Sequence, residues 1–290
     1  MKNNQSRFAR KLAFVLALAI CPLTSSASKS SAAAQETAQE TKKPVKLAAD
    51  AKTVDPKQDA WYQKYKNQEN IPEPGEMLIN TAKEPSLKRG FTPLFNGKDL
   101  DDWTPRGGHC TFEVVDGMIV GTCVPGSPST YLSTKRDDYT DFIFTCEMKW
   151  EEDGNSGVMF RAKVKDGKKG EVVYGPQAEM EGISGDRYWN GGIYGQSCGG
   201  YFYPVWLKGH EEARGSLDRE GWNRLTIRAK GNDVKTWVNG VPVAHWKDDG
   251  SYPKGYFGLQ VHAGKKGKVI WRDIRVKELD GAPKKRNNKK

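Results

Sequence analysis

The stretch Gln177-Ala178-Glu179-Met180-Glu181 alternates polar and apolar residues. Successive side chains of a β-strand point to opposite faces of a sheet. Ala178 and Met180 would therefore face a core, while the amide and the two carboxylates would form one polar row on the opposite face. The pattern predicts a half-buried strand, and it favours a β-sheet fold that carries a polar site on one face.

Two further stretches show the same division of faces. In Gly258-Leu259-Gln260-Val261-His262, the amide and the imidazole lie opposite the two aliphatic residues. In Gly157-Val158-Met159-Phe160-Arg161, the guanidinium lies opposite Val158 and Phe160. If these strands lie in one sheet, two carboxylates, an imidazole, a guanidinium and two amides gather on one surface. Such a collection of groups is typical of a catalytic or polar-ligand site, and it points toward sugars.

Short strands with frequent turn signals continue from Gly90 to about Asp280, and no segment shows a sustained helical stripe. Asp116-Gly117 and Asn239-Gly240 are signals for two-residue hairpins, because Asn, Asp and Gly tolerate positive φ. The sequence therefore predicts an all-β fold, an antiparallel two-sheet sandwich or jelly roll. The expected strands lie near 111–115, 118–123, 130–134, 141–150, 156–164, 176–181, 187–195, 222–230, 233–239, 241–246, 256–263 and 268–278.

The two ends of the chain differ from the globular part in composition. Residues 1–27 begin with four cations, continue through an apolar run and end in small residues, which is typical of a secretory signal peptide; an uncleaved membrane anchor is the alternative. Residues 28–88 are expected to be a largely disordered linker in which Trp61–Tyr65 forms a short helix or an arm on the domain. The globular domain would span residues 89–280 and a basic disordered tail residues 281–290. We therefore expect an exported, periplasmic or extracellular protein without a membrane span in its mature form.

The net charge of the chain is concentrated at these ends. Of the total of +10, four positive charges lie within residues 1–24 and five within residues 281–290, which leaves +1 for residues 25–280. A nearly neutral body lacks the broad positive field that binds phosphate backbones. The composition therefore argues against nucleic acid as a partner, including a nucleic-acid binder that uses the basic tail.

Four cysteines remain outside the signal segment, without a C-x-x-C or paired His spacing, so a zinc site is not expected. With a two-residue turn at Asp116-Gly117, Cys110 lies opposite Cys123 on the neighbouring strand. Export would permit oxidation, and the sequence therefore predicts a disulfide between these two residues. Two reduced thiols, or a bulge that shifts the register, are the alternatives.

Each candidate site residue also has a purely structural interpretation. Glu179 and Glu181 would stand about 6.5–7 Å apart along one strand, close enough to separate their pKa values into a base and an acid; a solvated row of acids is the alternative. Arg161 would bind one of these carboxylates or an anionic ligand, or form a structural ion pair. His262 could be catalytic or structural, and the turn at Asn155 could approach a ligand or be an ordinary turn.

Aromatic residues lie between the polar segments, and the rings of Tyr174, Trp189 and Tyr194 could stack on the C–H face of a sugar. The Gly-, Tyr- and Trp-rich segment 187–210 is interpreted as a ligand-side loop. Amides and carboxylates would bind the sugar hydroxyls, so Asn155, Gln177 and Gln260 are further candidates for substrate binding.

Nine short motifs follow one another between about residues 91 and 279. They are Phe95-Asn96-Gly97-Lys98-Asp99-Leu100-Asp101-Asp102-Trp103, Val115-Asp116-Gly117, Asn155-Ser156-Gly157 followed by Arg161, Gln177-Ala178-Glu179, Gly192-Ile193-Tyr194, Gly221-Trp222-Asn223, Val238-Asn239-Gly240, Gly258-Leu259-Gln260-Val261-His262 and Trp271-Arg272-Asp273-Ile274. In this order they resemble the 3-keto-glycoside lyase/hydratase domain, also called the 3-keto-disaccharide hydrolase domain.

The resemblance implies a concanavalin-like jelly roll, a cell-envelope location and sugar chemistry. One departure lies at Tyr174-Gly175-Pro176-Gln177, where the family usually has Tyr-Glu directly before the Gln-containing strand. If that glutamate is essential, either Glu179 or Glu181 replaces it or the activity is altered.

The expected reaction removes the C2 proton of a 3-keto-glycoside, expels the C1 substituent and adds water. Glu179 or His262 would be the base, Glu181 the acid partner, and Arg161 the group that stabilises the enolate. The sequence requires no cofactor, and it leaves open a divalent metal with unknown ligands. A lectin-like carbohydrate-binding module is the alternative function, since fold alone does not fix activity.

Overall fold

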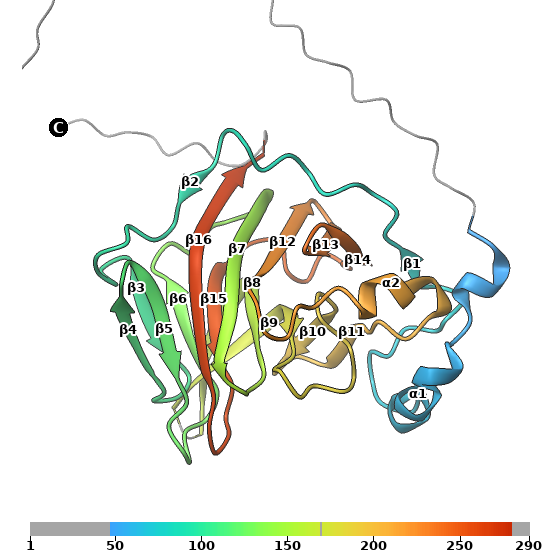
Figure 1. The fold of residues 1–290 in the computed structure, drawn as a ribbon, viewed down its shortest axis with the longest axis horizontal. Coiled ribbons are helices and arrows are strands. Elements are labelled where there is room, and N and C mark those ends of the chain that lie inside the picture. Colours follow the sequence, from blue (N-terminus) through green and yellow to red (C-terminus); the bar gives the residue numbers. More distant parts are fainter. Residues whose placement is uncertain (1–46, 169, 280–290) are drawn as a thin grey trace, which may run out of the picture. The chain divides into compact units, whose positions relative to one another are not determined.

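The computed structural model describes residues 47–168 and 170–279, and its strands form two antiparallel sheets (Figure 1). The larger sheet has the order β1-β14-β13-β12-β7-β16-β5-β4, and β2 pairs with β16. Its strands are β1 (Leu78–Ile79), β2 (Thr92–Pro93), β4 (Thr111–Val115), β5 (Met118–Thr122), β7 (Phe142–Glu152), β12 (Asn223–Lys230), β13 (Asp233–Val238), β14 (Val241–Lys247) and β16 (Lys268–Glu278).

The smaller sheet has the order β11-β10-β9-β8-β15-β6-β3. Its strands are β3 (Trp103–Arg106), β6 (Thr130–Thr134), β8 (Ser156–Gly167), β9 (Gly170–Met180), β10 (Ile193–Gln196), β11 (Gly200–Tyr203) and β15 (Tyr256–Val261). The chain passes repeatedly from one sheet to the other, as in β6-β7-β8 and β14-β15-β16. The expected class, an all-β antiparallel sandwich of the concanavalin-like jelly-roll type, is confirmed.

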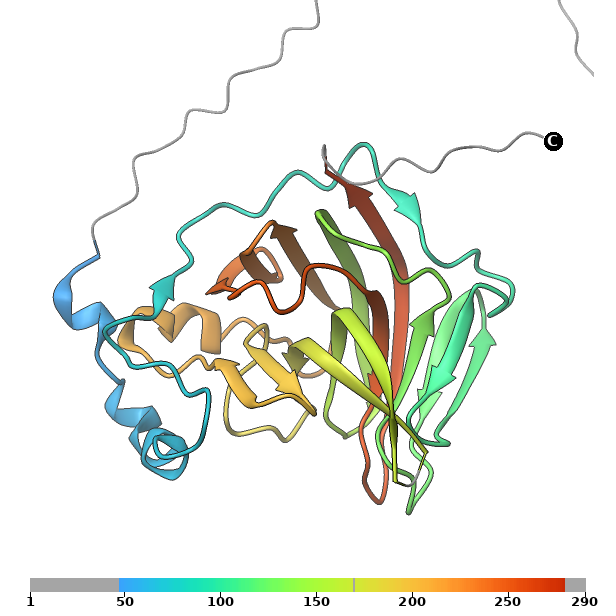
Figure 2. The same ribbon diagram turned by 180° about the vertical axis from the view of Figure 1, so that it is seen from behind.

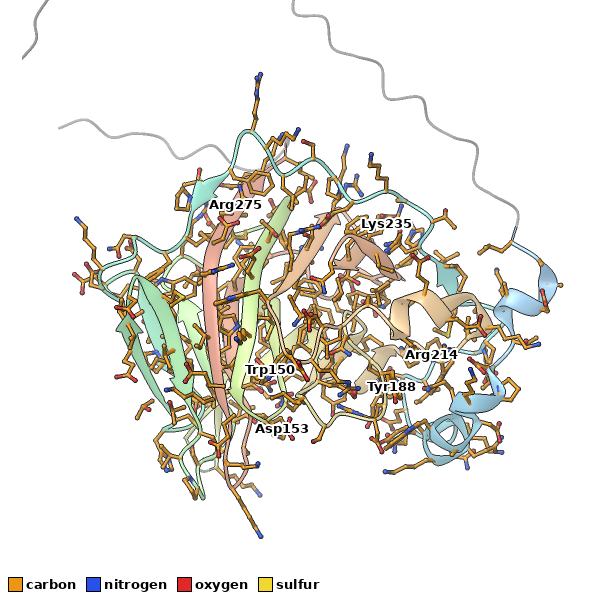
Figure 3. All side chains as sticks on the ribbon, in the orientation of Figure 1. Trp150, Asp153, Tyr188, Arg214, Lys235 and Arg275 are labelled. Carbon is orange, nitrogen blue, oxygen red and sulfur yellow. The ribbon has the colours of Figure 1, made fainter. Side chains whose placement is uncertain are left out.

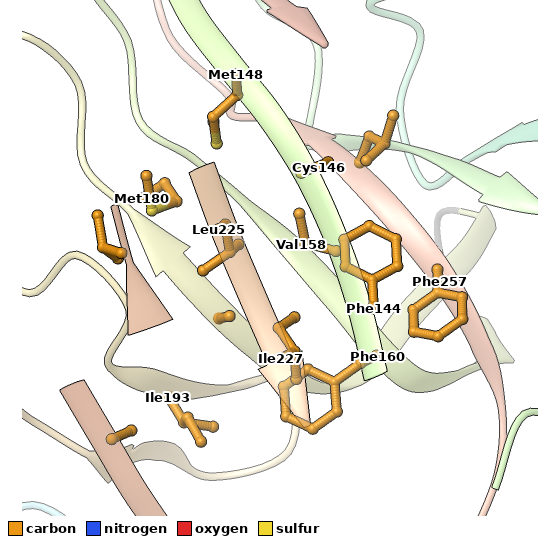
Figure 4. Close-up of a cluster of buried hydrophobic side chains, with 14 of the residues drawn as sticks. Phe144, Cys146, Met148, Val158, Phe160, Met180, Ile193, Leu225, Ile227 and Phe257 are labelled. Atoms are coloured by element: carbon orange, nitrogen blue, oxygen red, sulfur yellow. The ribbon is translucent and has the colours of Figure 1, made fainter. Parts of the chain in front are cut away.

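The core lies between the sheets and is built from the apolar residues of the alternating patterns (Figure 4). From the smaller sheet, Val158, Phe160 and Met180 are fully buried. They face residues such as Phe144 and Leu225 of the larger sheet, which are equally buried. Because these side chains fill the inner faces, the polar members of the same strands are directed to the outer face of the smaller sheet.

The β8–β9 hairpin bends where its register shifts. The β8–β9 register shifts between Met159 and Lys163, and Arg161 within the irregularity has φ 48°. The hairpin then reaches the far edge of the sheet, where Glu171 of β9 forms an ion pair of 2.5 Å with Arg106 of β3 (Figure 2). A second, smaller apolar cluster includes Tyr131, Met159, Ala162, Val173 and Tyr256.

Several strand boundaries differ from the sequence-based expectation. β10 (Ile193–Gln196) covers only the last three residues of the expected strand 187–195, and the preceding residues form a loop. Five strand segments were not expected: β1, β2, β3, β11 and the first half of β9. The first half of β9 is half-exposed and leaves the sandwich with the hairpin, so its sequence carries no simple one-sided apolar pattern.

The expectation of a largely disordered linker is wrong for residues 47–88. This segment contains η1 (Ala49–Lys52), η2 (Pro56–Gln58), α1 (Asp59–Tyr65) and β1, which pairs with β14. Buried Asp55 forms an ion pair with Arg214 of α2 (Glu211–Arg214), which follows η3 (Lys208–His210). The segment orders because strand pairing and polar contacts attach it to the domain, and because Tyr65 and Met77 are buried in the main core. The expected signal segment and the basic tail lie outside the described residues.

Candidate functional site

A row of hydrogen-bonded polar side chains crosses the outer face of the smaller sheet. Gln177 Nε2 donates to Gln260 Oε1 at 2.8 Å and lies 3.4 Å from Glu179 Oε1. Gln260 Nε2 in turn donates to the hydroxyl of Tyr131 at 3.1 Å, and Asn155 Nδ2 lies 3.4 Å from Glu179 Oε2. Gln177 and Glu179 of β9 and Gln260 of β15 are therefore brought together as predicted, with β8 between the two strands.

Gly157 makes this row possible because it has no side chain. It is paired with Glu179 across β8 and β9. A Cβ atom at Gly157 would lie 2.5 Å from Gln177 Nε2 and 2.6 Å from the carbonyl oxygen of Ala178. The amide of Gln177 thus occupies the space above a glycine on its way from β9 to β15, a close approach that any other residue would block.

Glu179 is the central ionisable group of the row and is only 5 % exposed. Burial raises its pKa from 4.5 to about 7, with a further rise from the charge of Glu181; Arg187 and the contact with Asn155 act in the opposite direction. A carboxyl with this pKa exchanges a proton near neutral pH, which is the property of a general base or acid.

Glu181 is also buried but has a dedicated cationic partner. Arg187 Nε lies 2.6 Å from Glu181 Oε1, and the backbone N–H of Tyr188 donates to Glu181 Oε2 at 2.9 Å. Burial is the largest influence and leaves the pKa of Glu181 raised, although Arg187 and the N–H donors of the loop act in the opposite direction. Burial lowers the pKa of Arg187, but the charges of Glu179 and Glu181 outweigh this effect and raise it. Arg187 therefore stays cationic beside two carboxyl groups.

A pocket of about 380 Å³ opens beside these groups. Asn155, Glu181 and Arg187 line it, whereas Glu179 lies just beyond two of these lining residues. Asp153 of the β7–β8 turn also lines the pocket, as do residues 184–187 of the loop that leads to Tyr188. Asp153 and Tyr188 are labelled in Figure 3. The remaining wall comes from α1, through Trp61, Lys64 and Tyr65.

Several buried polar atoms around the site lack a hydrogen-bond partner among the described residues, among them Gln177 Oε1, Trp189 Nε1 and Asn190 Nδ2. Glu181 Oε1 also lacks a hydrogen bond but lies in the ion pair with Arg187. Asn190 uses its own oxygen to accept the backbone N–H of Glu181 at 2.8 Å, so its position is fixed. Buried polar groups are nearly always satisfied by protein or water, so these atoms keep unused hydrogen-bonding capacity inside the site.

The structure corrects the role predicted for Arg161. Its guanidinium donates to the backbone carbonyls of Thr140, Gly231 and Tyr252, and its charged partner is Asp141 at 3.4 Å. The contact expected with Glu179 or Glu181 is absent, because the irregularity with positive φ at Arg161 turns the side chain out of the polar row. Arg161 is a buried structural residue, and Arg187 is the cation beside the carboxyl groups.

His262 and Tyr174 are not joined to the row by any contact of the described residues. His262 follows the last residue of β15, is exposed, and places Nδ1 2.6 Å from the carbonyl oxygen of Ala263. Tyr174 lies on the bent part of the hairpin, where Lys165 sits over its ring at 5.2 Å. The next residue is Gly175, in the place where the family usually has a glutamate; it has φ 132°, and a Cβ atom there would lie 3.1 Å from Ala162 Cα. The carboxyl groups of the site are therefore those of Glu179 and Glu181.

The aromatic residues predicted to bind sugar have different positions, since Trp189 is buried and Tyr194 is half-buried. Trp189 is buried, and Arg187 lies over its ring at 4.9 Å, so this ring positions the guanidinium. Tyr194 is half-buried, pairs with Gln177 across β9 and β10, and contacts the ring of Tyr201. Tyr194 therefore borders the amide row from β10.

Sequence reasoning did not assign roles to Arg187, Tyr131, Asn190 or α1. Arg187 lay inside the segment interpreted as a ligand-side loop, and its position six residues after Glu181 gave no periodic signal. Its proximity arises from the loop that turns back along Glu181, where a Cβ atom on Gly185 would meet the Glu181 side chain at 2.5 Å. The path of this loop is determined by tertiary packing, which a sequence pattern does not reveal.

The hairpin register predicted around Asp116-Gly117 is confirmed, because Val115 pairs with Met118 and Thr111 with Thr122. Cys110 and Cys123 follow directly outside this last pair, and both are buried free thiols in the structure. The bridge is thus not formed here, and it stays a prediction for the oxidised protein.

In the described part of the chain, no cluster of three or more His, Cys, Asp or Glu side chains could hold a metal ion. No helix in residues 47–168 or 170–279 is long and apolar enough to cross a membrane.

Comparisons with known proteins add a family and several structural likenesses. A candidate glycosyl hydrolase from Parabacteroides distasonis shares 22% identity, with a TM-score of 0.45 over 66% of this chain and 94% of that one. A protein of unknown function with a galectin-like fold from Bacillus subtilis shares 16% identity, with a TM-score of 0.44 over 68% and 97%. The carbohydrate-binding module CBM66 from Bacillus subtilis shares 14%, with a TM-score of 0.41 over 61% and 96%.

A search of curated protein sequences gave no match. The sequence profile of one family matches residues 90–277, which include both sheets of the sandwich except β1, as well as the whole amide and carboxyl row. The chain belongs to the family of the 3-keto-alpha-glucoside-1,2-lyase-like domain.

Proposed function

We propose that this protein cleaves 3-keto-glycosides, such as 3-keto-disaccharides, by elimination followed by hydration. The observation that carries the proposal is Glu179, a buried carboxyl with a pKa of about 7, next to the Glu181–Arg187 ion pair at the edge of a pocket. The family points to the same chemistry. A base that titrates near neutral pH and a cation beside it are the two groups that enolate formation needs.

The first step is removal of the proton on C2, which the ketone at C3 acidifies. Glu179 in its ionised form accepts this proton, and the C–H electron pair forms the enolate. The enolate then expels the C1 substituent, so that the C1–O bond breaks and a double bond forms between C1 and C2. The leaving oxygen takes up a proton as it departs, and Glu179, now protonated beside the adjacent carbon, can supply it.

The second step returns the elements of water. Glu179, ionised again, removes a proton from water as the oxygen adds to C1, and the same carboxyl then delivers that proton to C2. The products are a 3-keto sugar and the free alcohol, so the net change is hydrolysis of the glycosidic bond. One carboxyl can serve both steps because C1 and C2 are adjacent.

Arg187 stabilises the negative charge that develops on the ketone oxygen. It lines the pocket and stays cationic, and its position is fixed by Glu181 on one side and the ring of Trp189 on the other. Removing one such stabilising group typically costs about 10²–10³-fold in rate. Glu181 acts through Arg187 in this scheme, which differs from its predicted role as the acid.

Asn155 is the amide placed to bind a sugar hydroxyl, because it lines the pocket and contacts Glu179. Gln177 is fully buried and does not line the pocket, and its Nε2 is fixed by Gln260. Its role in this scheme is to position Glu179, which its Nε2 approaches at 3.4 Å.

The test is an assay of a 3-keto-disaccharide with the wild type and Glu179→Gln, together with calorimetric binding. We expect turnover by the wild type, a loss of about 10²-fold or more in the variant, and binding retained in both. Binding by both proteins without turnover by either would identify a lectin-like module instead. Repeating the assay after chelator treatment tests for a divalent metal.

We also propose that the protein acts after export, in the periplasm or outside the cell. The support is the composition of residues 1–27, with a basic start, an apolar run and small residues after it. Mass spectrometry of the N-terminus of the protein recovered from the cell envelope or medium tests this. A mature chain that still begins at Met1 in the cytoplasm would contradict it.

A further inference from the structure

One wall of the pocket comes from outside the family domain. The matched domain begins at residue 90, whereas Trp61, Lys64 and Tyr65 of α1 line the pocket together with Asn155, Glu181 and Arg187. The family domain by itself would leave the pocket open on this side. The segment before the domain therefore contributes directly to the candidate site.

Specific contacts hold α1 in this position. Just before the helix, Thr53 and Asp55 form backbone hydrogen bonds with Lys208 and Trp206, and Asp55 is also paired with Arg214. Within the helix, the ring of Tyr62 meets the ring of Trp206 edge-on at 5.0 Å. This side of α1 is fixed to the domain, which leaves the side with Trp61 and Lys64 to face the pocket.

After the helix the chain remains attached. Asn70 Nδ2 donates to the carbonyl oxygen of Gly199 at 3.1 Å, and β1 pairs with β14. The side chain of Asn80 donates to the carbonyl oxygen of Thr236 at 2.9 Å, and this contact is buried. With contacts on both sides, α1 is a built part of the pocket wall.

A continuous aromatic stack links α1 to the cation of the site. Trp61 is stacked on Tyr65 with ring centroids 5.9 Å apart and planes 11° apart. Tyr65 contacts Trp189 at 5.6 Å, and Trp189 lies beneath the guanidinium of Arg187. Tyr65 is buried, whereas Trp61 is half-exposed, so the stack ends in an accessible indole at the pocket.

Lys64 adds a hydrogen-bond donor to this surface. Its Nζ lies 4.7 Å from the centroid of the Trp61 ring and 5.2 Å from that of Tyr65. A half-exposed indole beside an ammonium group offers an apolar contact for the C–H groups of a sugar and donors for its hydroxyls.

Resting on the proposed function, we propose that α1 forms the subsite for the leaving group, with Trp61 and Lys64 binding the second sugar of a 3-keto-disaccharide. The 3-keto ring occupies the end of the pocket near Glu179 and Arg187, where the chemistry takes place. The group attached at C1 then extends toward α1. Trp61 is thus a residue that determines specificity for the leaving group and does not take part in proton transfer.

The experiment compares the steady-state kinetics of the full chain on a 3-keto-disaccharide and on methyl 3-keto-glucoside, which lacks the second ring. Trp61→Ala should raise KM for the disaccharide about tenfold, the scale of one aromatic contact, and leave kcat/KM for the methyl glycoside within about twofold. Trp61→Phe should recover most of the affinity. Trp222→Ala is the matched control, because Trp222 is half-buried under Arg272 at 3.9 Å, outside the pocket.

Equal KM changes for both substrates, or no change for either, would overturn the subsite. If the wild type turns over neither substrate, the proposed reaction fails, and calorimetry with the unoxidised disaccharide still decides the role of α1. Weaker binding by Trp61→Ala than by Trp222→Ala then supports the subsite, and equal binding refutes it. Circular dichroism of each variant verifies the fold in either case.

Discussion

Replacing Glu179 by Gln removes a carboxyl whose ionisation the folded protein disfavours. In the wild type, burial raises the pKa of Glu179 from 4.5 to about 7. Between these two pH values the folded state holds a proton that the unfolded state has released. The free energy of unfolding of the wild type therefore falls as pH rises through this window, and the penalty is complete above pH 7.

The size of this change in the free energy of unfolding follows from the difference between the two pKa values of Glu179. About 2.5 pH units at about 1.36 kcal/mol each correspond to about 3 kcal/mol, the order of the cost of ionising Glu179 in the folded state. Glutamine lacks this cost but loses one acceptor, since the contacts with Asn155 and Gln177 both need an oxygen. That loss is about 1 kcal/mol and does not depend on pH.

The assay is urea unfolding of both proteins at pH 5 and pH 8.5, with stabilities from linear extrapolation. Between pH 5 and pH 8.5, the free energy of unfolding of Glu179→Gln should rise by about 3 kcal/mol relative to that of the wild type. Differences between the two proteins that do not depend on pH cancel in this comparison. Glu113→Gln, on exposed Glu113 of β4 in the other sheet, is the control and should follow the wild type. Parallel pH dependences of the wild type and Glu179→Gln would refute the perturbed carboxyl and, with it, its assignment as the base.

Four further predictions concern the rest of the site and one hairpin. Gly157→Ala should cost about 1–3 kcal/mol and at least tenfold in kcat, because its Cβ atom displaces the buried amide row; unchanged kinetics would contradict the role of that row. Arg187→Met should lower kcat about 10²-fold or more, with partial recovery in Arg187→Lys. His262→Ala should keep kcat within about twofold, since its exposed ring contacts only backbone, and a large loss would restore it as a candidate base. Mass mapping of the exported protein should find the bridge from Cys110 to the opposite cysteine, and Cys110→Ser should then lower the melting temperature more than the activity.

The sequence was sufficient for the sheets and for half of the site. Alternation in short segments identified the strands that carry Gln177, Glu179 and Gln260, and their shared face followed from the period of two. Asp116-Gly117 fixed a hairpin register that the structure reproduces. These features depend on local geometry, in which the direction of a side chain follows from its place in the strand.

Features that depend on a departure from regular geometry could not be predicted. Arg161 continues the alternation of its strand, but the residue has positive φ, so its side chain leaves the row that the pattern assigns to it. Arg187 reaches Glu181 only because the following loop returns along the strand. The order of residues 47–88 arises from contacts with partners more than a hundred residues away, such as Asp55 with Arg214. None of these leaves a periodic signal.

The charges of the site are arranged unevenly around two buried carboxyls, both of which have a raised pKa. Arg187 contacts Glu181 directly and reaches Glu179 only through space. Glu181 is therefore compensated, whereas Glu179 remains buried with two weak amide contacts at 3.4 Å. A base that must accept and return a proton twice in one cycle requires this asymmetry, because a strong ion pair would keep it ionised. The same asymmetry explains why Glu179, and not Glu181, is the residue on which the proposed reaction depends.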